Sequence, residues 1–145
     1  MQVSTADGYR LMISRKSSSP LVNLKIERSA EGRFTDDRLL LIDQMREIAA
    51  GSKPPYQVSL ETSVQNGIEV LAINNRDIDH VSGVISMYTL LDAANGNVAT
   101  AYLLNQRPEV REYASYEEYA ELRDRFIGLL AGCMARAASG SKNTN

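Results

Sequence analysis

The residues whose types could do chemistry lie around His80, the single histidine of the chain, in the segment NNRDIDHVSG. Asp77 and Asp79 precede it, and imidazole with carboxylates is a combination that binds metal ions. No second histidine or nearby cysteine completes a zinc site. A calcium loop would need an oxygen ligand where Val81 stands and a closing glutamate where Tyr88 stands. The sequence therefore predicts no metal or other cofactor, and a solvated loop around His80.

Nucleophilic catalysis has equally little support in the sequence. A GxSxG elbow is absent, and Cys133 falls on the apolar stripe of the last predicted helix, where a small buried thiol packs like an apolar side chain. The carboxylate pair Glu117 and Glu118 falls in the predicted first turn of that helix, where the helix dipole favours negative charge. We predict no catalytic residue and expect the chain not to be an enzyme.

Chain topology brings charged and aromatic residues together. In an antiparallel meander, the loop 74–82 leads into one strand and the loop 107–114 follows the strand paired with it, so both lie at one end of the sheet. We expect the segment containing Pro54 and Pro55 to reach the same end. Mixed charge on loops of a rigid sheet suits recognition of a protein surface, whereas a merely charged, soluble rim is the alternative. The predicted partner-binding residues are Arg76, Asp77, Asp79, His80, Arg107, Glu109, Arg111 and Tyr113.

The stretch 81–106, VSGVISMYTLLDAANGNVATAYLLNQ, predicts two long strands joined at Asn95 and Gly96, which tolerate the positive φ of a tight turn. If these are the two central turn residues, Leu91 faces Thr100. Both faces of this hairpin are apolar, and one is small at its alanines. Such a strand pair belongs in the middle of a sheet with each face covered.

Further strands are predicted by alternation of apolar and polar residues. One hairpin opens the chain over 9–15 and 21–28. A second spans 56–64 and 68–74, with Asn66 and Gly67 as its turn. The polar face of the strand at 56–64 places it near an edge of the sheet.

Two helices are predicted by apolar residues at three- and four-residue intervals, over 36–50 and from Ser115 to about Arg136. The order ββ-α-ββββ-α indicates an α+β fold with a largely antiparallel sheet and a helix on each face, an α/β/α sandwich. We expect residues 1–136 to form a single domain and residues 137–145 to be a disordered tail.

Composition is that of an ordinary globular domain. A chain of 145 residues that is 43% apolar can bury a core without a metal or a disulfide. Its net charge of −2 argues against general affinity for nucleic acid. No segment reaches the roughly 20 apolar residues of a membrane span, and MQVSTADGYR is not an export signal. We expect a cytoplasmic protein, or a periplasmic one if Met1 replaces a removed signal peptide.

The succession DGYRLMIS, a capped helix, IEVLAINN, GVISMYTLL, NVATAYLLNQ and YEEYAELRDRFIGLLAGC resembles the PsbP-like α/β/α sandwich group, which includes small bacterial exported proteins and lipoproteins. The resemblance covers roughly Gly8 to Ala135 and rests on element order and a final Y-x-x-L-x-x-x-F helix. It implies a non-enzymatic binding or assembly factor. Small immunity proteins that neutralise toxins from bacterial secretion systems are similar in size and architecture.

The sequence therefore leads to a non-enzymatic protein-binding module as the first hypothesis: a bacterial immunity or inhibitor protein that blocks a toxin with the loop-bearing end of its sheet. The alternative is a small-ligand-binding or accessory assembly protein of the PsbP-like type, possibly exported. Tyr88, Tyr102 and Tyr119 would line its pocket between the sheet and a helix. Self-association through an uncovered sheet face, giving a homodimer, is a third hypothesis.

Overall fold

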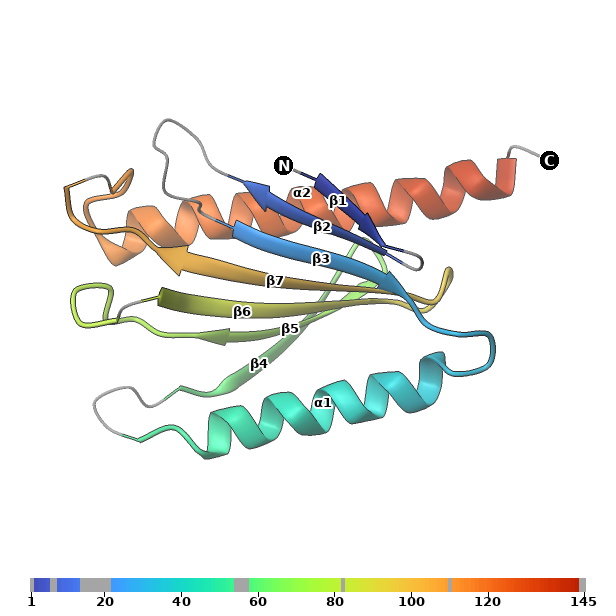
Figure 1. The fold of residues 1–145 in the computed structure, drawn as a ribbon, viewed down its shortest axis with the longest axis horizontal. Coiled ribbons are helices and arrows are strands. Elements are labelled where there is room, and N and C mark those ends of the chain that lie inside the picture. The colour runs from blue at the N-terminus through green and yellow to red at the C-terminus, as the bar shows by residue number, and fades with distance from the viewer. Residues whose placement is uncertain are drawn as a thin grey trace.

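The computed structural model describes residues 2–5, 8–13, 22–53, 58–81, 83–109 and 111–143, with side chains described between Val22 and Arg136. Within these ranges the sheet order is β1-β2-β3-β7-β6-β5-β4, and every neighbouring pair is antiparallel. The predicted α+β class with a largely antiparallel sheet is confirmed (Figure 1). The elements are β1 (Gln2–Thr5), β2 (Gly8–Ile13), β3 (Val22–Arg28), α1 (Phe34–Ala50), β4 (Leu60–Gln65), β5 (Ile68–Asn74), β6 (Gly83–Asp92), β7 (Asn97–Asn105) and α2 (Tyr116–Asn143).

Both ends of the chain add to the predicted order. Strand β1 precedes the predicted opening hairpin and pairs Gln2 with Leu11 and Thr5 with Gly8. Its sequence QVST is too short and too polar to show alternation. Helix α2 extends to Asn143, beyond the predicted end near Arg136, where the sequence analysis expects a disordered tail. The alanines of ARAAS favour continuation of the helix. The prediction ended the helix earlier because the glycine and serines that follow are poor helix formers.

The β6–β7 hairpin has a wider turn than predicted. Leu91 pairs with Val98 and Asp92 with Asn97, so residues 93–96 form the turn and the predicted partner of Leu91 is wrong by two residues. The buried carboxylate of Asp92 stabilises this turn, because it accepts hydrogen bonds from the backbone N–H of Asn95 at 3.3 Å and from its side-chain amide at 3.2 Å. A register shift of two residues leaves each side chain on the same face of the sheet. The predicted assignment of side chains to the two faces is therefore correct over most of the hairpin.

The β4–β5 turn matches the prediction. Gln65 pairs with Ile68, and Asn66 and Gly67 have φ values of 53° and 79°, as a two-residue type I′ turn requires. Strand β4 is the last strand of the sheet, which confirms its predicted place at an edge.

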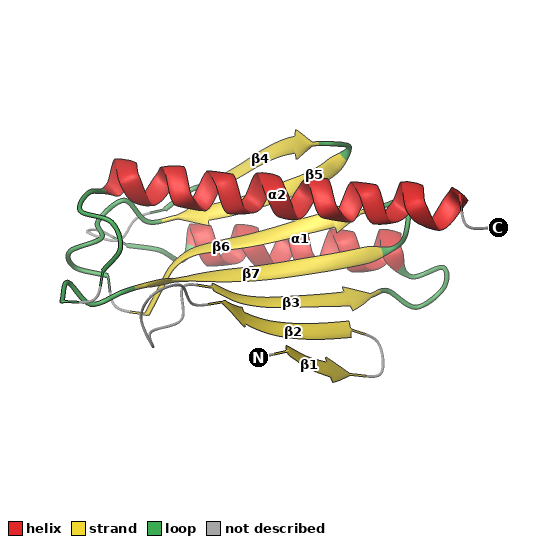
Figure 2. Ribbon diagram, turned by 90° about the horizontal axis from the view of Figure 1, so that it is seen from above, coloured by secondary structure: helices red, strands yellow, loops and turns green. Residues whose placement is uncertain are grey.

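The two helices lie on opposite faces of the sheet: Figure 2 shows α2 in front of it and α1 behind. On the α1 side, Met45 is buried against Leu71, Ile73 and Leu91. The Arg38 guanidinium also ties α1 to β5, because it donates two hydrogen bonds, of 2.7 and 2.9 Å, to the Glu69 carboxylate. These hydrogen bonds lower the pKa of Glu69.

On the α2 side the core is larger and extends across β3, β7, β6 and β5. Its sheet residues include Leu90, Ala99 and Ala101, whose side chains have no exposed surface. Helix α2 contributes Tyr119 and Ile127 from its inner stripe. The alanines that the sequence places on one face of the hairpin therefore lie on the face that α2 covers.

Coverage of the central hairpin is complete on the α2 side and partial on the α1 side. A helix is about 10–12 Å wide and strands are about 4.8 Å apart, so one helix covers only two or three strands. Helix α1 contacts β4 and β5. The same face of β3 and β7 beyond it carries the polar side chains of Lys25, Glu27 and Thr100. The prediction that both faces are hidden from water is thus met by β6 more fully than by β7.

We expect Ala101→Leu to destabilise the protein, because Ala101 is fully buried on the α2 side and a larger side chain must displace its neighbours. Urea denaturation should show the free energy of unfolding lowered by about 1–3 kcal/mol. Thr100→Leu, one residue along on the other face, should change it by less than about 0.5 kcal/mol. Equal effects of the two substitutions would contradict this packing.

Candidate functional site

The two loops predicted to share one end of the sheet do so. We call the described residues of 75–81 and 106–115 the loop end. Asn105, at the end of β7, donates hydrogen bonds from its side-chain amide to the carbonyl oxygens of Ile78 and of Val81, the latter at 2.7 Å. Its side-chain oxygen accepts a hydrogen bond from the Tyr113 hydroxyl at 2.6 Å. One asparagine therefore connects the loop before β6 with the loop after β7.

Arg111 is a second connection between these loops. Its guanidinium donates to the carbonyl oxygens of Gln106 and Ile78, both at 3.2 Å, and to the Asp79 carboxylate at 3.3 Å. The guanidinium also lies 5.4 Å from the centre of the Tyr113 ring. Only 9% of its side-chain surface is exposed. Arg111 belongs to the predicted partner-binding set, but the structure gives it the role of holding the loops together.

Tyr113 also turns inward. Its hydroxyl accepts a hydrogen bond from the backbone N–H of Gln106 at 3.1 Å, besides the one it donates to Asn105. Its ring packs 5.2 Å from that of Tyr119, and burial raises the pKa of the Tyr113 hydroxyl. Tyr113 is thus a buried residue that supports the loop end, and it is not part of the exposed surface.

His80 forms an ion pair with Asp77 at the surface. Its Nδ1 lies 2.8 Å from a carboxylate oxygen of Asp77, and 71% of its side chain is exposed. The hydrogen bond to Asp77 and the negative charge there raise the pKa of His80, and the same hydrogen bond lowers the pKa of Asp77. Asp77 is itself held by its backbone N–H, which donates to the Asn75 side chain at 2.9 Å. His80 therefore carries more positive charge near neutral pH than an isolated histidine.

The remaining predicted residues point to solvent. Arg76 is exposed and its guanidinium lies 5.3 Å from the centre of the Tyr116 ring. The lead-in to β4 also reaches this end, since Val58 and Ser59 line a hollow of about 210 Å³ together with Arg76. Pro54 and Pro55 lie outside the described residues. Five predicted residues of the loop end are exposed, and we call them the charged rim: Arg76, Asp79, His80, Arg107 and Glu109.

Candidate metal ligands and membrane spans were also sought. Among the described residues, no three His, Cys, Asp or Glu side chains gather where a metal could bind. Neither helix, over its described length, combines the length and apolarity of a membrane span.

Cys133 is exposed and accepts a hydrogen bond from Arg136 at 3.3 Å, so the predicted burial of this thiol is wrong. Met134 and Leu130 occupy the inner side of α2 instead.

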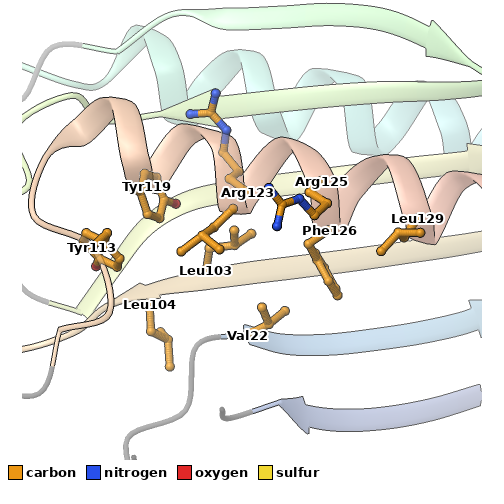
Figure 3. A pocket seen from close by; sticks show the side chains of 10 residues that line it. Val22, Leu103, Leu104, Tyr113, Tyr119, Arg123, Arg125, Phe126 and Leu129 are labelled. Atoms are coloured by element: carbon orange, nitrogen blue, oxygen red, sulfur yellow. The ribbon is translucent and has the colours of Figure 1, made fainter. Parts of the chain in front are cut away.

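The sequence predicts a pocket between the sheet and a helix, and the structure has a groove beside α2 whose lining differs from the predicted one. It has a volume of about 280 Å³ and lies between α2 and the strands β3 and β7 (Figure 3). Of the three tyrosines predicted to line a pocket, Tyr119 lines this groove and Tyr88 lines a separate hollow between the sheet and α2, whereas Tyr102 faces the α1 side. The lining residues are Val22, Leu103, Leu104, Tyr113, Tyr119, Leu122, Arg123, Arg125, Phe126 and Leu129.

A buried polar chain lies under the start of α2. The Tyr119 and Ser86 hydroxyls are 2.6 Å apart, and Ser86 donates to the Asn74 side chain at 2.6 Å. Burial raises the pKa of Tyr119. Because Ser86 is buried and both hydroxyls are engaged, this chain satisfies polar groups within the core.

No family model matches the chain, and no match is found among curated proteins or solved structures. The resemblance to the PsbP-like group remains a prediction. Function is therefore argued from the loop end and the groove.

Asn105→Ala should destabilise the loop end, because it leaves two backbone carbonyls and the Tyr113 hydroxyl without this partner. We expect the free energy of unfolding to fall by about 2–3 kcal/mol in urea denaturation. The matched control is Asn23→Ala on β3, where the side chain is exposed, and its effect should stay within about 0.5 kcal/mol. A small effect at Asn105 would mean that the loops do not depend on it.

The His80–Asp77 pair should be visible by NMR, since the single histidine gives one imidazole Cε1–H signal. The pKa of His80 should lie above its ordinary value of 6.5 and return toward it in Asp77→Asn. Because the folded state binds this proton more tightly, the stabilisation is present below about pH 6.5 and is lost as the pH rises through the folded-state pKa. A pKa unchanged by Asp77→Asn would contradict the pair.

Proposed function

We propose that this chain is a non-enzymatic protein-binding module, a bacterial immunity or inhibitor protein that neutralises a secretion-system toxin by binding it through the loop end. The observation that carries the proposal is the pair of cross-linked loops. Asn105 and Arg111 hold the two loops against each other, while the charged rim stays exposed.

Such an arrangement favours binding for two physical reasons. Loops that are already held in one conformation lose little entropy when a partner binds. The rim carries both signs of charge, with Arg76 and Arg107 against Asp79 and Glu109, so it orients a partner of complementary pattern and repels others. The partner that fits is a protein surface with mixed charge.

The α/β/α sandwich of the PsbP-like group is the fold-level part of the proposal. It is supported by the order of elements and by the placement of α1 and α2 on opposite faces (Figure 2). A fold of this kind is a scaffold, and the function depends on what its loops and grooves present.

A small-ligand or accessory assembly protein is the second candidate. The groove beside α2 favours it, because apolar side chains from a helix and a sheet line a single concave surface. The two candidates use different parts of the molecule and can be tested separately.

The first test is binding to the product of the neighbouring gene, because an immunity protein is encoded beside its toxin. We expect a stable complex, with protection of cells that express both proteins. The double variant Arg76→Glu, Arg107→Glu should weaken the complex about tenfold or more, mainly through slower association. Calorimetry and surface plasmon resonance measure this.

The matched control reverses two exposed arginines elsewhere, Arg28→Glu and Arg46→Glu, which changes the net charge equally. This control should bind like the unmodified protein, and circular dichroism should show both variants folded. Absence of a complex would refute the proposal. Equal loss in both variants would place the binding surface outside the charged rim.

A further inference from the structure

We propose that the groove beside α2 binds a single aliphatic chain with an anionic head group, and that the head group pairs with Arg125. This inference is independent of the loop-end proposal. It concerns the strip between α2 and the strands β3 and β7 (Figure 3).

The groove is a concave surface whose lining is mostly apolar, and part of that lining is exposed. Leu122, Phe126 and Leu129 line it from α2, and Leu129 is 61% exposed. On the opposite face, the strip of β3 and β7 beyond α1 carries the polar side chains of Lys25 and Thr100 beside Tyr102. An exposed apolar side chain that borders an apolar groove is typical of a surface that binds a ligand.

Arg125 provides the charge complementarity. It lies three residues after Leu122 and four before Leu129, so it sits between them on the same side of the helix. It is exposed and lines the groove, and no described acidic group pairs with it. Arg123 differs, because it is 11% exposed and donates to Asp124 and to the Tyr116 hydroxyl, both at 2.9 Å. Figure 3 shows the Arg123 guanidinium directed away from the groove and that of Arg125 close to Phe126.

The lining also determines the rest of the ligand. The hydroxyls of Tyr113 and Tyr119 are engaged with Asn105 and Ser86, so few polar groups remain for a sugar or a peptide backbone. A volume of about 280 Å³ lies at the lower limit of small-molecule sites, roughly 300–1,000 Å³, and suits one chain rather than a fused-ring lipid. A guanidinium binds a carboxylate or a phosphate in two parallel hydrogen bonds. The ligand is therefore a fatty acid or the acyl chain of an anionic lipid.

The test titrates the protein with decanoate, decanol and decyltrimethylammonium, each below its micelle concentration, using calorimetry. We expect saturable one-to-one binding of decanoate, about tenfold tighter than decanol, and weaker binding of the cation. Arg125→Gln should lower decanoate affinity to that of decanol and leave decanol unchanged. Leu129→Asp should weaken both, because it places a charge in the apolar wall.

The matched controls are Arg46→Gln and Leu39→Asp, which change an exposed arginine and an exposed leucine on α1. Neither should alter binding, and neither should the double variant Arg76→Glu, Arg107→Glu. Failure of the loop-end proposal would therefore leave this result intact, and the reverse also holds.

Flotation with phosphatidylglycerol vesicles distinguishes the two sources of the chain. Arg125-dependent binding to vesicles assigns the groove to a membrane lipid, and binding to monomeric decanoate alone assigns it to a free fatty acid. The proposal is overturned if neither ligand binds, or if Arg125→Gln leaves decanoate affinity unchanged. A dimer that Leu129→Asp dissociates in sedimentation would also overturn it, because a second copy would then fill the groove.

Discussion

Burial of the β6–β7 hairpin on both of its surfaces is the constraint from which the rest of this structure follows. Leu90, Ala99 and Ala101 face one side, and Leu91 and Val98 face the other, all shielded from water. A strand pair of this kind cannot occupy an edge, so other strands flank it, and a helix packs on each face (Figure 1). Polar residues are consequently concentrated in the loops and on the outer strands.

The width of the sheet explains the surfaces that remain. One helix covers two or three strands, and the described sheet has seven, so each helix leaves a strip uncovered. Beside α1 the strip carries polar side chains such as Lys25 and Thr100. Beside α2 the strip is apolar and carries Arg125 at its rim, which makes it a candidate for a ligand site and not a simple edge of the core.

The loop end shows how polar groups can be both structural and functional. The side-chain amide of Asn105 donates to two backbone carbonyls, and so does the Arg111 guanidinium. Their bonds fix the positions of exposed neighbours such as Asp79 and Arg107. Mutations of Asn105 and Arg111 should therefore lower stability, and mutations of Asp79 and Arg107 should weaken recognition, so the two roles can be separated experimentally.

Local features of this protein follow from the sequence alone. The Asn66–Gly67 turn has the predicted geometry, and Ser115 caps α2 by accepting a hydrogen bond from the Glu118 N–H at 3.2 Å. Glu118 in turn accepts one from the Ala114 N–H at 2.9 Å. These features depend on residues a few positions apart, so residue type and spacing suffice to predict them. The α+β class and the common position of the two loops follow from the same patterns.

Tertiary structure decided which side chains of these elements meet. Whether Arg111 is exposed depends on the carbonyl group of Ile78, 33 positions away, and the register of β6 and β7 depends on the turn that Asp92 stabilises. The groove exists because α2 and β3, a strand about a hundred residues earlier in the chain, both contribute side chains to its lining. The spacing of residues in the sequence does not predict such contacts. They depend on which surfaces pack together once the helices and strands have formed.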